Sequence, residues 1–266
     1  MSHWTLNDIP WDRFDPAKVE SSILRLAKAA SLVEQNGADY TRYLCNVFAD
    51  DPAFQEAARI WGEEEVQHGA ALGHWSTLAD PSFDHAASSA RFSAGFRVDL
   101  DAEHSIRGSR AGELVARCIV ESGTSSYYTA LAEATQEPVL REICRRIAAD
   151  ELRHYKLFYT HMKRYLARER LGRWRRLRVA LGRIRESEDD ELSYAYFVAS
   201  AAPGAVYDRG RAHREYLAAA ARVYRPHHVE RVVAMTFKAI GLKPHGRLNL
   251  LTADIAWRAL RRRAVA

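Results

Sequence analysis

The chain has 266 residues, of which 47% are hydrophobic and 27% charged, proportions typical of a globular protein with one sizeable core. It contains no apolar run approaching the roughly 18 residues of a membrane-spanning helix, and its first residues lack the basic and apolar regions of a secretory signal. Its three cysteines are widely spaced, which argues against a disulfide framework, and we expect a cytoplasmic protein without a transmembrane segment.

The first half of the chain predicts a short strap followed by two helices. Residues 1–17 are rich in Trp, Phe and Pro and are expected to lie along the surface as an N-terminal strap. A first helix is predicted from about Lys18 to Phe48. A second is predicted from Pro52 to about Leu78, because Asp51 and Pro52 form a typical helix start.

Two more helices follow a stretch of mixed character at about 80–108. The third is predicted from about Ala111 to Thr135, and the fourth from Pro138 to at least Glu169. Short connections join helices one to two and three to four, as antiparallel neighbours require. The long connection from helix two to helix three lets the chain travel back along the bundle before the next helix begins.

The C-terminal part begins with a strongly basic segment. Residues 163–185 hold nine Arg and one Lys against one acid, a local charge of about +9, so with a net charge of +5 the rest of the chain is mildly acidic. We expect this segment to continue helix four and residues 189–263 to form two to four further helices. No strand-like alternation occurs, so the predicted fold is all-α, with a strap at 1–17, a four-helix bundle at 18–169 and a helical extension at 170–266.

Each of the four predicted bundle helices has an apolar seam that a glutamate interrupts near its middle. The helices carrying the second and fourth glutamates add a histidine three residues later, which lies on nearly the same helix face. The spacing repeats, since 31 residues separate the first two glutamates and 30 separate the last two. The resulting set is Glu34, Glu65, His68, Glu121, Glu151 and His154.

A single Glu-x-x-His pair carries little information, because about one is expected by chance among 19 Glu and 11 His. The position of these residues is more informative. Four carboxylates and two imidazoles would converge in the bundle interior, with no Lys or Arg on the same seams to pair with them. Unpaired buried carboxylates cost several kcal/mol each, on the order of the penalty for any buried ion. Two divalent cations would remove this penalty.

The same ligand set is typical of ferritin-like di-iron and di-manganese carboxylate proteins, in which two helices give one Glu and two give Glu-x-x-His. We therefore predict a ferritin-like four-helix bundle that binds two metal ions. Glu34 would join His68 at one ion and Glu121 would join His154 at the other, or the pairing would be crossed, with Glu65 and Glu151 bridging. Oxygen ligands with one imidazole per ion suit iron, with manganese as the alternative in one or both sites.

Three helices carry a more specific resemblance. The run Ile143-Cys-Arg-Arg-Ile-Ala-Ala-Asp-Glu-Leu-Arg-His154 resembles the I-C-x-x-I-A-A-D-E-x-R-H helix of the soluble acyl-acyl-carrier-protein desaturases. Residues Arg59–Gly69 resemble their R-x-W-x-x-E-E-x-x-H-G motif, and Glu121-Ser-Gly-Thr124 resembles their E-x-x-T. The resemblance extends over about residues 34–165, and none is found in residues 187–266.

The resemblance implies a di-iron oxidase or oxygenase that activates O2 and oxidises an apolar, fatty-acyl-like substrate. It also implies an external ferredoxin-like electron donor, a role for Thr124 in delivering protons, and a homodimer. The absence of any C-x-x-C pair agrees with an external donor, because the chain has no rubredoxin module of its own. The reaction outcome stays open among desaturation, hydroxylation and N-oxygenation.

The basic segment 163–185 suggests a partner surface, since Trp and Leu alternate with its arginines. An acidic acyl carrier protein would dock there by electrostatic attraction. An anionic membrane surface, RNA, and a solvated helix that merely packs on the C-terminal helices are the alternatives. Without a recognised nucleic-acid module, we expect no nucleic-acid partner.

Two other functions remain compatible with the six residues. One is a ferroxidase or a rubrerythrin-like peroxidase, although the chain lacks a rubredoxin module and carries a long C-terminal addition. The other is a binding protein in which the metal is structural and no reaction is catalysed.

Overall fold

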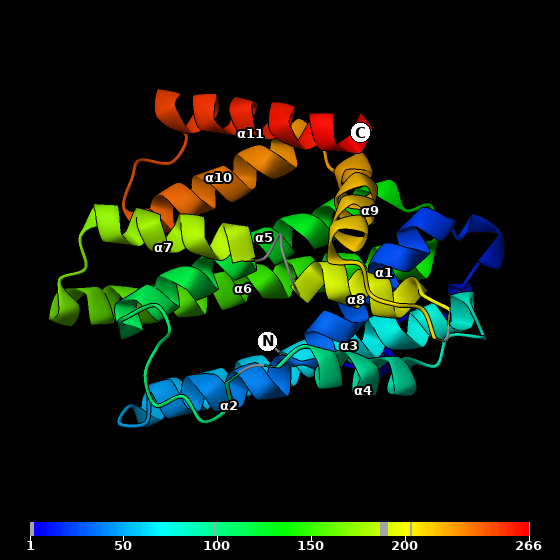
Figure 1. The fold of residues 1–266 in the computed structure, drawn as a ribbon, viewed down its shortest axis with the longest axis horizontal. Helices are drawn as coiled ribbons and strands as arrows, with labels where there is room; N and C mark the ends of the chain where they lie inside the picture. Colours follow the sequence, from blue (N-terminus) through cyan, green and yellow to red (C-terminus); the bar gives the residue numbers. More distant parts are fainter. Residues whose placement is uncertain (1–2, 98, 187–190, 203, 266) are drawn as a thin grey trace.

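The computed structural model describes residues 3–97, 99–186, 191–202 and 204–265, and within these ranges every regular element is a helix (Figure 1). Three short 3-10 turns, η1 (Leu6–Asp8), η2 (Trp11–Arg13) and η3 (Pro16–Lys18), form the N-terminal strap. The α-helices are α1 (Ser21–Gln35), α2 (Gly37–Val47), α3 (Pro52–Ala79), α4 (His85–Gly95), α5 (Arg110–Ala134), α6 (Pro138–Glu169), α7 (Arg173–Glu186), α8 (Leu192–Ser200), α9 (Arg209–Val223), α10 (Pro226–Ile240) and α11 (Arg247–Val265).

Four helical stretches form the bundle: α1 with α2, then α3, α5 and α6. Their starts have the local chemistry that helices require. Asp51 accepts a hydrogen bond from Phe54 N at the start of α3, and Ser109 does so from Gly112 N at the start of α5. Glu137 caps α6 through Leu140 N. The predicted all-α fold, a four-helix bundle with additional C-terminal helices, is confirmed within the described residues, and its helix ends agree closely with the predicted ones.

The first bundle helix is not continuous as predicted, because the chain makes a turn at Asn36 between α1 and α2. The backbone N–H of Asn36 donates a hydrogen bond to the carbonyl oxygen of Val33, as in a tight 3-10 turn. The turn lies where α2 meets α3 closely: a Cβ added at Gly37 would lie only 2.6 Å from Glu65 Cβ. Hydrophobic periodicity does not report such an interruption, since the apolar seam continues on both sides of it.

The connections differ from the prediction in two places. The long connection between α3 and α5 contains the helix α4, where only a stretch of mixed character was expected. The basic segment does not simply continue α6, because the chain leaves that helix at Arg170 in the left-handed conformation, with φ of 51°. After Gly172 it starts α7, which packs on α5 and α10. Leu177 and Ala180 give α7 an apolar face that a free extension would leave in water.

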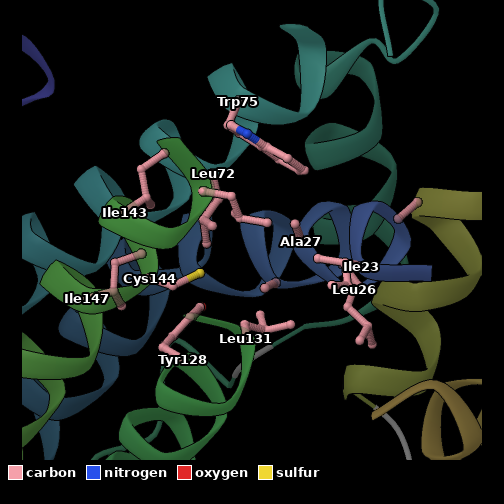
Figure 2. Packing of buried hydrophobic residues seen from close by; sticks show 14 of the residues in the cluster. Ile23, Leu26, Ala27, Leu72, Trp75, Tyr128, Leu131, Ile143, Cys144 and Ile147 are labelled. Atoms are coloured by element: carbon pink, nitrogen blue, oxygen red, sulfur yellow. The ribbon is translucent and has the colours of Figure 1, made fainter. Parts of the chain in front are cut away.

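Two apolar clusters fill the bundle, one on each side of a polar layer. The first joins α1, the C-terminal half of α3, the end of α5 and the start of α6; Figure 2 shows several of its side chains meeting, among them Leu26, Leu72 and Leu131. The second joins α2, the start of α3, the start of α5 and the end of α6, around Phe54 and Phe158. The six predicted metal ligands lie in the sequence intervals between the two clusters on every bundle helix.

The C-terminal helices cover one side of the bundle. α8 packs on α1 and α4, α10 packs on α5, and α11 lies outermost against α9 and α10 (Figure 1). Among the described helices none combines the length and the apolar character needed to cross a membrane. The division into strap, bundle and extension at residues 17 and 169 remains a proposal, and residues 1–2 of the strap lie outside the described ranges.

Candidate metal centre

The six predicted side chains come together in the polar layer of the bundle. Glu34 comes from the last turn of α1, Glu65 and His68 from the middle of α3, Glu121 from α5, and Glu151 and His154 from α6. All six residues are buried.

The six residues form two overlapping groups. Glu34, Glu65, His68 and Glu151 make one group, and Glu65, Glu121, Glu151 and His154 make the other, with the ligand atoms of each group within 4.8 Å of one another. Glu65 and Glu151 belong to both. This arrangement is expected when each of two ions binds one Glu and one His that the other ion does not bind, while two further carboxylates bridge both ions. Glu34 groups with His68 and Glu121 with His154, rather than in the crossed pairing.

Five buried atoms of the layer lack a well-formed hydrogen bond in the described part of the chain: Oε1 of Glu65, Glu121 and Glu151, and Nδ1 of His68 and His154. They are close to one another, since His154 Nδ1 lies 2.9 Å from Glu65 Oε1 and His68 Nδ1 lies 3.4 Å from Glu151 Oε1. Buried polar atoms normally make well-formed hydrogen bonds, so this cluster calls for a ligand that accepts electron pairs. Carboxylate oxygens and imidazole nitrogens fit divalent iron or manganese, and the residues present therefore fit a pair of such ions.

Without cations the carboxylates repel one another, and their pKa values show it. Burial and the neighbouring Glu151 raise the pKa of Glu65 to about 7 and that of Glu121 to about 8. Burial and Glu65 raise the pKa of Glu34 well above its usual range. Burial would also raise the pKa of Glu151, but hydrogen bonds with His154 and His68 outweigh it and lower that pKa.

Each histidine is oriented by a carboxylate from the opposite Glu-x-x-His helix. His68 Nε2 lies 3.0 Å from Asp150 Oδ2, and His154 Nε2 lies 2.6 Å from Glu64 Oε2. With Nε2 as the donor in these bonds, Nδ1 of each ring is free to face the centre. A carboxylate behind a metal-binding histidine commonly fixes the tautomer and ring orientation in this way.

These two carboxylates are functional candidates that the sequence prediction did not include. A signal for them does exist, since an acid precedes the glutamate in both motifs, Glu64-Glu65-x-x-His68 and Asp150-Glu151-x-x-His154. The pattern does not show that each acid serves the other motif's histidine. That exchange follows only from the packing of α3 against α6.

Two hydroxyl groups also reach the cluster. Tyr128 of α5 donates a hydrogen bond to Glu34 Oε1, and the Thr124 hydroxyl lies within hydrogen-bond distance of Glu151 Oε2. The same hydroxyl also lies near the carbonyls of Val120 and Glu121. Thr124 therefore does lie at the cluster, on a bridging carboxylate, and its predicted role in proton delivery remains a proposal.

The N-terminal strap closes the outer side of the His68 half. The Trp4 ring stacks on the His68 ring with centroids 5.9 Å apart, and Trp4 Nε1 donates to Asp150 Oδ2 at 2.7 Å. Arg153 Nη1 holds the other oxygen of Asp150. Burial raises the pKa of Asp150, but the hydrogen bonds of His68 and Trp4 and the charge of Arg153 outweigh it and lower that pKa, so the carboxylate stays ionised.

Comparison with known proteins found a family match and a similar solved structure for this chain. The rubrerythrin family model matches residues 113–236, which include α5, α6 and the helices up to α10. The solved structure of DesA2 from Mycobacterium tuberculosis H37Rv, named as an acyl-ACP desaturase, is similar at 18% sequence identity and a TM-score of 0.49. That similarity covers 95% of this chain and 90% of DesA2. No curated protein sequence matches the chain significantly.

The rubrerythrin family match and the six converging side chains overlap in part. The match itself begins at Glu113 and so covers the helices that carry Glu121, Glu151 and His154, whereas α1 and α3 supply the rest of the site. The family model thus covers somewhat less than half of the chain, and the six side chains form a candidate centre for two metal ions.

Proposed function

We propose that this protein is a di-iron oxidoreductase that uses O2 to oxidise an apolar, fatty-acyl-like substrate. The observation that carries the proposal is the pair of overlapping groups of buried carboxylates and histidines, in each of which the possible ligand atoms lie within 4.8 Å of one another. The helix motifs that resemble the soluble acyl-acyl-carrier-protein desaturases favour this reaction class over metal storage. Bound iron would supply the O2 chemistry: of the four electrons that reduce O2 to water, two would come from the substrate and two from an external donor by way of the iron.

The residues of the chain have distinct roles in this proposal. Glu34 and His68 would hold one ion, Glu121 and His154 the other, and Glu65 and Glu151 would bridge them. Asp150 and Glu64 keep the two imidazoles in the orientation that leaves Nδ1 free. Tyr128 and Thr124 hold oxygens of Glu34 and Glu151, which limits how far these carboxylates can move as protons arrive.

The apolar clusters on both sides of the layer exclude water from the centre. Phe158, Trp61 and Ile147 are all buried close to the ligands in sequence. Exclusion of water protects reactive oxygen species from side reactions, which oxidation of an unactivated C–H bond requires. An external ferredoxin-like protein would supply electrons, and an acyl carrier protein at residues 163–185 would deliver the substrate.

A rubrerythrin-like peroxidase is the second candidate, and the rubrerythrin family match over residues 113–236 favours it. Such an enzyme would reduce H2O2 and give no organic product. The same six ligands would serve both reactions, so fold and ligands do not separate them.

The test is to load the protein anaerobically with iron, determine iron per chain, and then add O2 with a reductant and a set of acyl-carrier-protein thioesters. We expect about two irons per chain and an oxidised acyl product by mass spectrometry. Glu151→Gln should lose iron and product, whereas Glu142→Gln, on the same helix but paired with Arg146 at the surface, should retain both. Fast peroxide reduction without any acyl product would instead establish the second candidate.

A further inference from the structure

A pocket lies beside the candidate metal centre, and the proposed reaction does not use the residues that line this pocket. It has a volume of about 270 Å³ and lies among α2, α5, the end of α7 and the connection before α5. Tyr40, Tyr43, Phe96 and Ile106 give it an aromatic and apolar wall, and Arg117 lies among its charged residues.

Arg117 is the unusual member of this lining. The residue is only 5% exposed, and its Nε atom makes no hydrogen bond within the described part of the chain. Its nearest carboxylate atom is Glu113 Oε1, 4.0 Å from Nε, which is too long for a hydrogen bond. The guanidinium carbon lies 4.8 Å from the centre of the Tyr40 ring and 5.9 Å from that of Trp61. The two rings hold the cation in place without neutralising it.

The pocket's four acids are Asp99, which is exposed, and three that already accept hydrogen bonds. Glu113 Oε2 accepts hydrogen bonds from Tyr43 at 2.9 Å and Ser105 at 2.7 Å. Glu186 accepts hydrogen bonds from both terminal nitrogens of Arg107, at 2.6 and 2.5 Å. Glu191 accepts from Tyr40 at 2.9 Å and faces Arg183 at 3.8 Å. None of these three carboxylates forms a close ion pair with Arg117.

A buried guanidinium without a close anion is costly, because its charge has lost water and gained no equivalent partner. An anion that enters the pocket would supply the missing partner. Arg offers a planar fork that fits a carboxylate with two parallel hydrogen bonds. The four carboxylates that line the pocket disfavour a dianion such as phosphate, so a single negative charge fits best. The aromatic and apolar wall would receive the organic part of the molecule.

We propose that this pocket binds a small organic monocarboxylate, with Arg117 as its counter-ion. The site lies one helical turn from Glu121 on α5, so it is next to the metal centre without sharing a ligand with it. The proposal goes beyond the proposed function and does not depend on it, since binding requires neither metal nor catalysis.

The test is calorimetric titration of the metal-free full-length chain with benzoate and with hexanoate, and with benzamide as the uncharged analogue of benzoate. We expect at least one acid to bind and benzamide to bind at least about tenfold more weakly, since a charge-assisted hydrogen bond is lost. Arg117→Gln should lower the affinity by at least about tenfold, and Arg117→Lys by less, because charge remains while the fork is lost.

Two further variants distinguish this binding from general effects. Glu113→Gln removes a negative charge beside Arg117 and should tighten carboxylate binding, a gain that a misfolded protein would not show. Arg231→Gln, in a different pocket with Arg141 and Glu133, should leave the affinity unchanged. Absence of binding by both acids up to about 10 mM, or equal affinities for wild type and Arg117→Gln, would overturn the proposal; 10 mM corresponds to only about −2.7 kcal/mol.

Discussion

At the scale of single residues, the two histidines of the candidate metal centre depend on carboxylates outside the predicted ligand set. Asp150 and Glu64 each bond to Nε2 of the histidine on the opposite helix, which leaves Nδ1 of both rings facing the cluster. The ligands are therefore oriented before any metal arrives. Such pre-orientation limits the entropy lost when a metal binds.

We expect Asp150→Asn to lower metal affinity by about 10–100-fold, the usual effect of losing a carboxylate behind a metal-binding histidine. Chelator competition on the metal-loaded protein measures this change. Glu63→Gln is the matched control, because Glu63 is exposed and adjacent to Glu64. An unchanged affinity in Asp150→Asn would mean that this carboxylate does not orient His68.

The raised pKa values predict how stability depends on pH. The carboxyls of Glu65 and Glu121 have folded-state pKa values of about 7 and 8, above the ordinary value of 4.5, so the folded form binds more protons there. For His68, burial lowers the pKa, but Asp150 and Glu151 outweigh it and raise it to about 9 from 6.5. The stabilisation linked to these protons is present at low pH and is lost as pH rises through 7 to 9.

The metal-free protein should therefore lose stability between pH 6 and pH 9, by on the order of 1 kcal/mol per pH unit for each group that titrates. Metal ions displace these protons, so the rise in Tm caused by metal should be larger at pH 8 than at pH 6. Thermal unfolding with and without Mn²⁺ at the two pH values checks both statements. A metal effect that is equal at both would argue that the carboxylates do not bind the ion.

At the scale of helices, glycine decides how closely α1 and α2 approach α3. A Cβ at Gly69 would lie 2.7 Å from the backbone nitrogen of Gln35, the residue after the ligand Glu34. This contact is with backbone, so the neighbouring helix itself would have to shift. Gly123 on α5, two residues after Glu121, meets nothing within 4 Å.

Gly69→Ala should destabilise the protein by about 1–3 kcal/mol through overpacking, despite the better helix propensity of alanine. Gly123→Ala should stabilise it by about 0.5–1 kcal/mol, because only the propensity changes there. Denaturant unfolding of the metal-free proteins measures both. If the two variants changed stability in the same direction, close packing at Gly69 would not be the reason for glycine there.

At the scale of the whole molecule, the basic character is concentrated on α7 and the end of α6. Trp174 is 83% exposed on this surface, and Arg173, Arg175 and Arg178 around it are also exposed. The opposite face of α7 packs on α5 and α10, so the helix serves both as core and as surface. The structural role of the segment and a role in docking are therefore compatible.

If an acyl carrier protein docks here, charge reversal of Arg175 and Arg178 to Glu should weaken binding by about tenfold or more, and the loss should shrink as salt is added. Surface plasmon resonance at two salt concentrations measures this. Arg258→Glu on α11 is the control for net charge. Equal weakening by the control would indicate a general charge effect, and tighter binding to anionic vesicles than to the carrier would favour a membrane surface.

The homodimer stays a prediction, for which sedimentation analysis is the test.

The sequence by itself determined the all-α class, the four bundle helices and the six candidate ligands. It could do so because helix periodicity places residues on one face by local geometry alone, and a glutamate in an apolar seam is a local anomaly. The short cap motif at Asp51 is equally local.

Other features were decided only by the tertiary structure, because they depend on distances between residues far apart in the chain. Asp150 bonds to His68 and Glu64 bonds to His154 only because α3 packs on α6. The Trp4 ring stacks on the His68 ring only because the strap folds back over the bundle. The break at Asn36 and the return of α7 onto α5 follow from close helix packing. Likewise, Arg117 is an ordinary basic helix residue in the sequence. Packing buries it in a pocket, and it lacks a close anion there because the neighbouring carboxylates have bonded elsewhere.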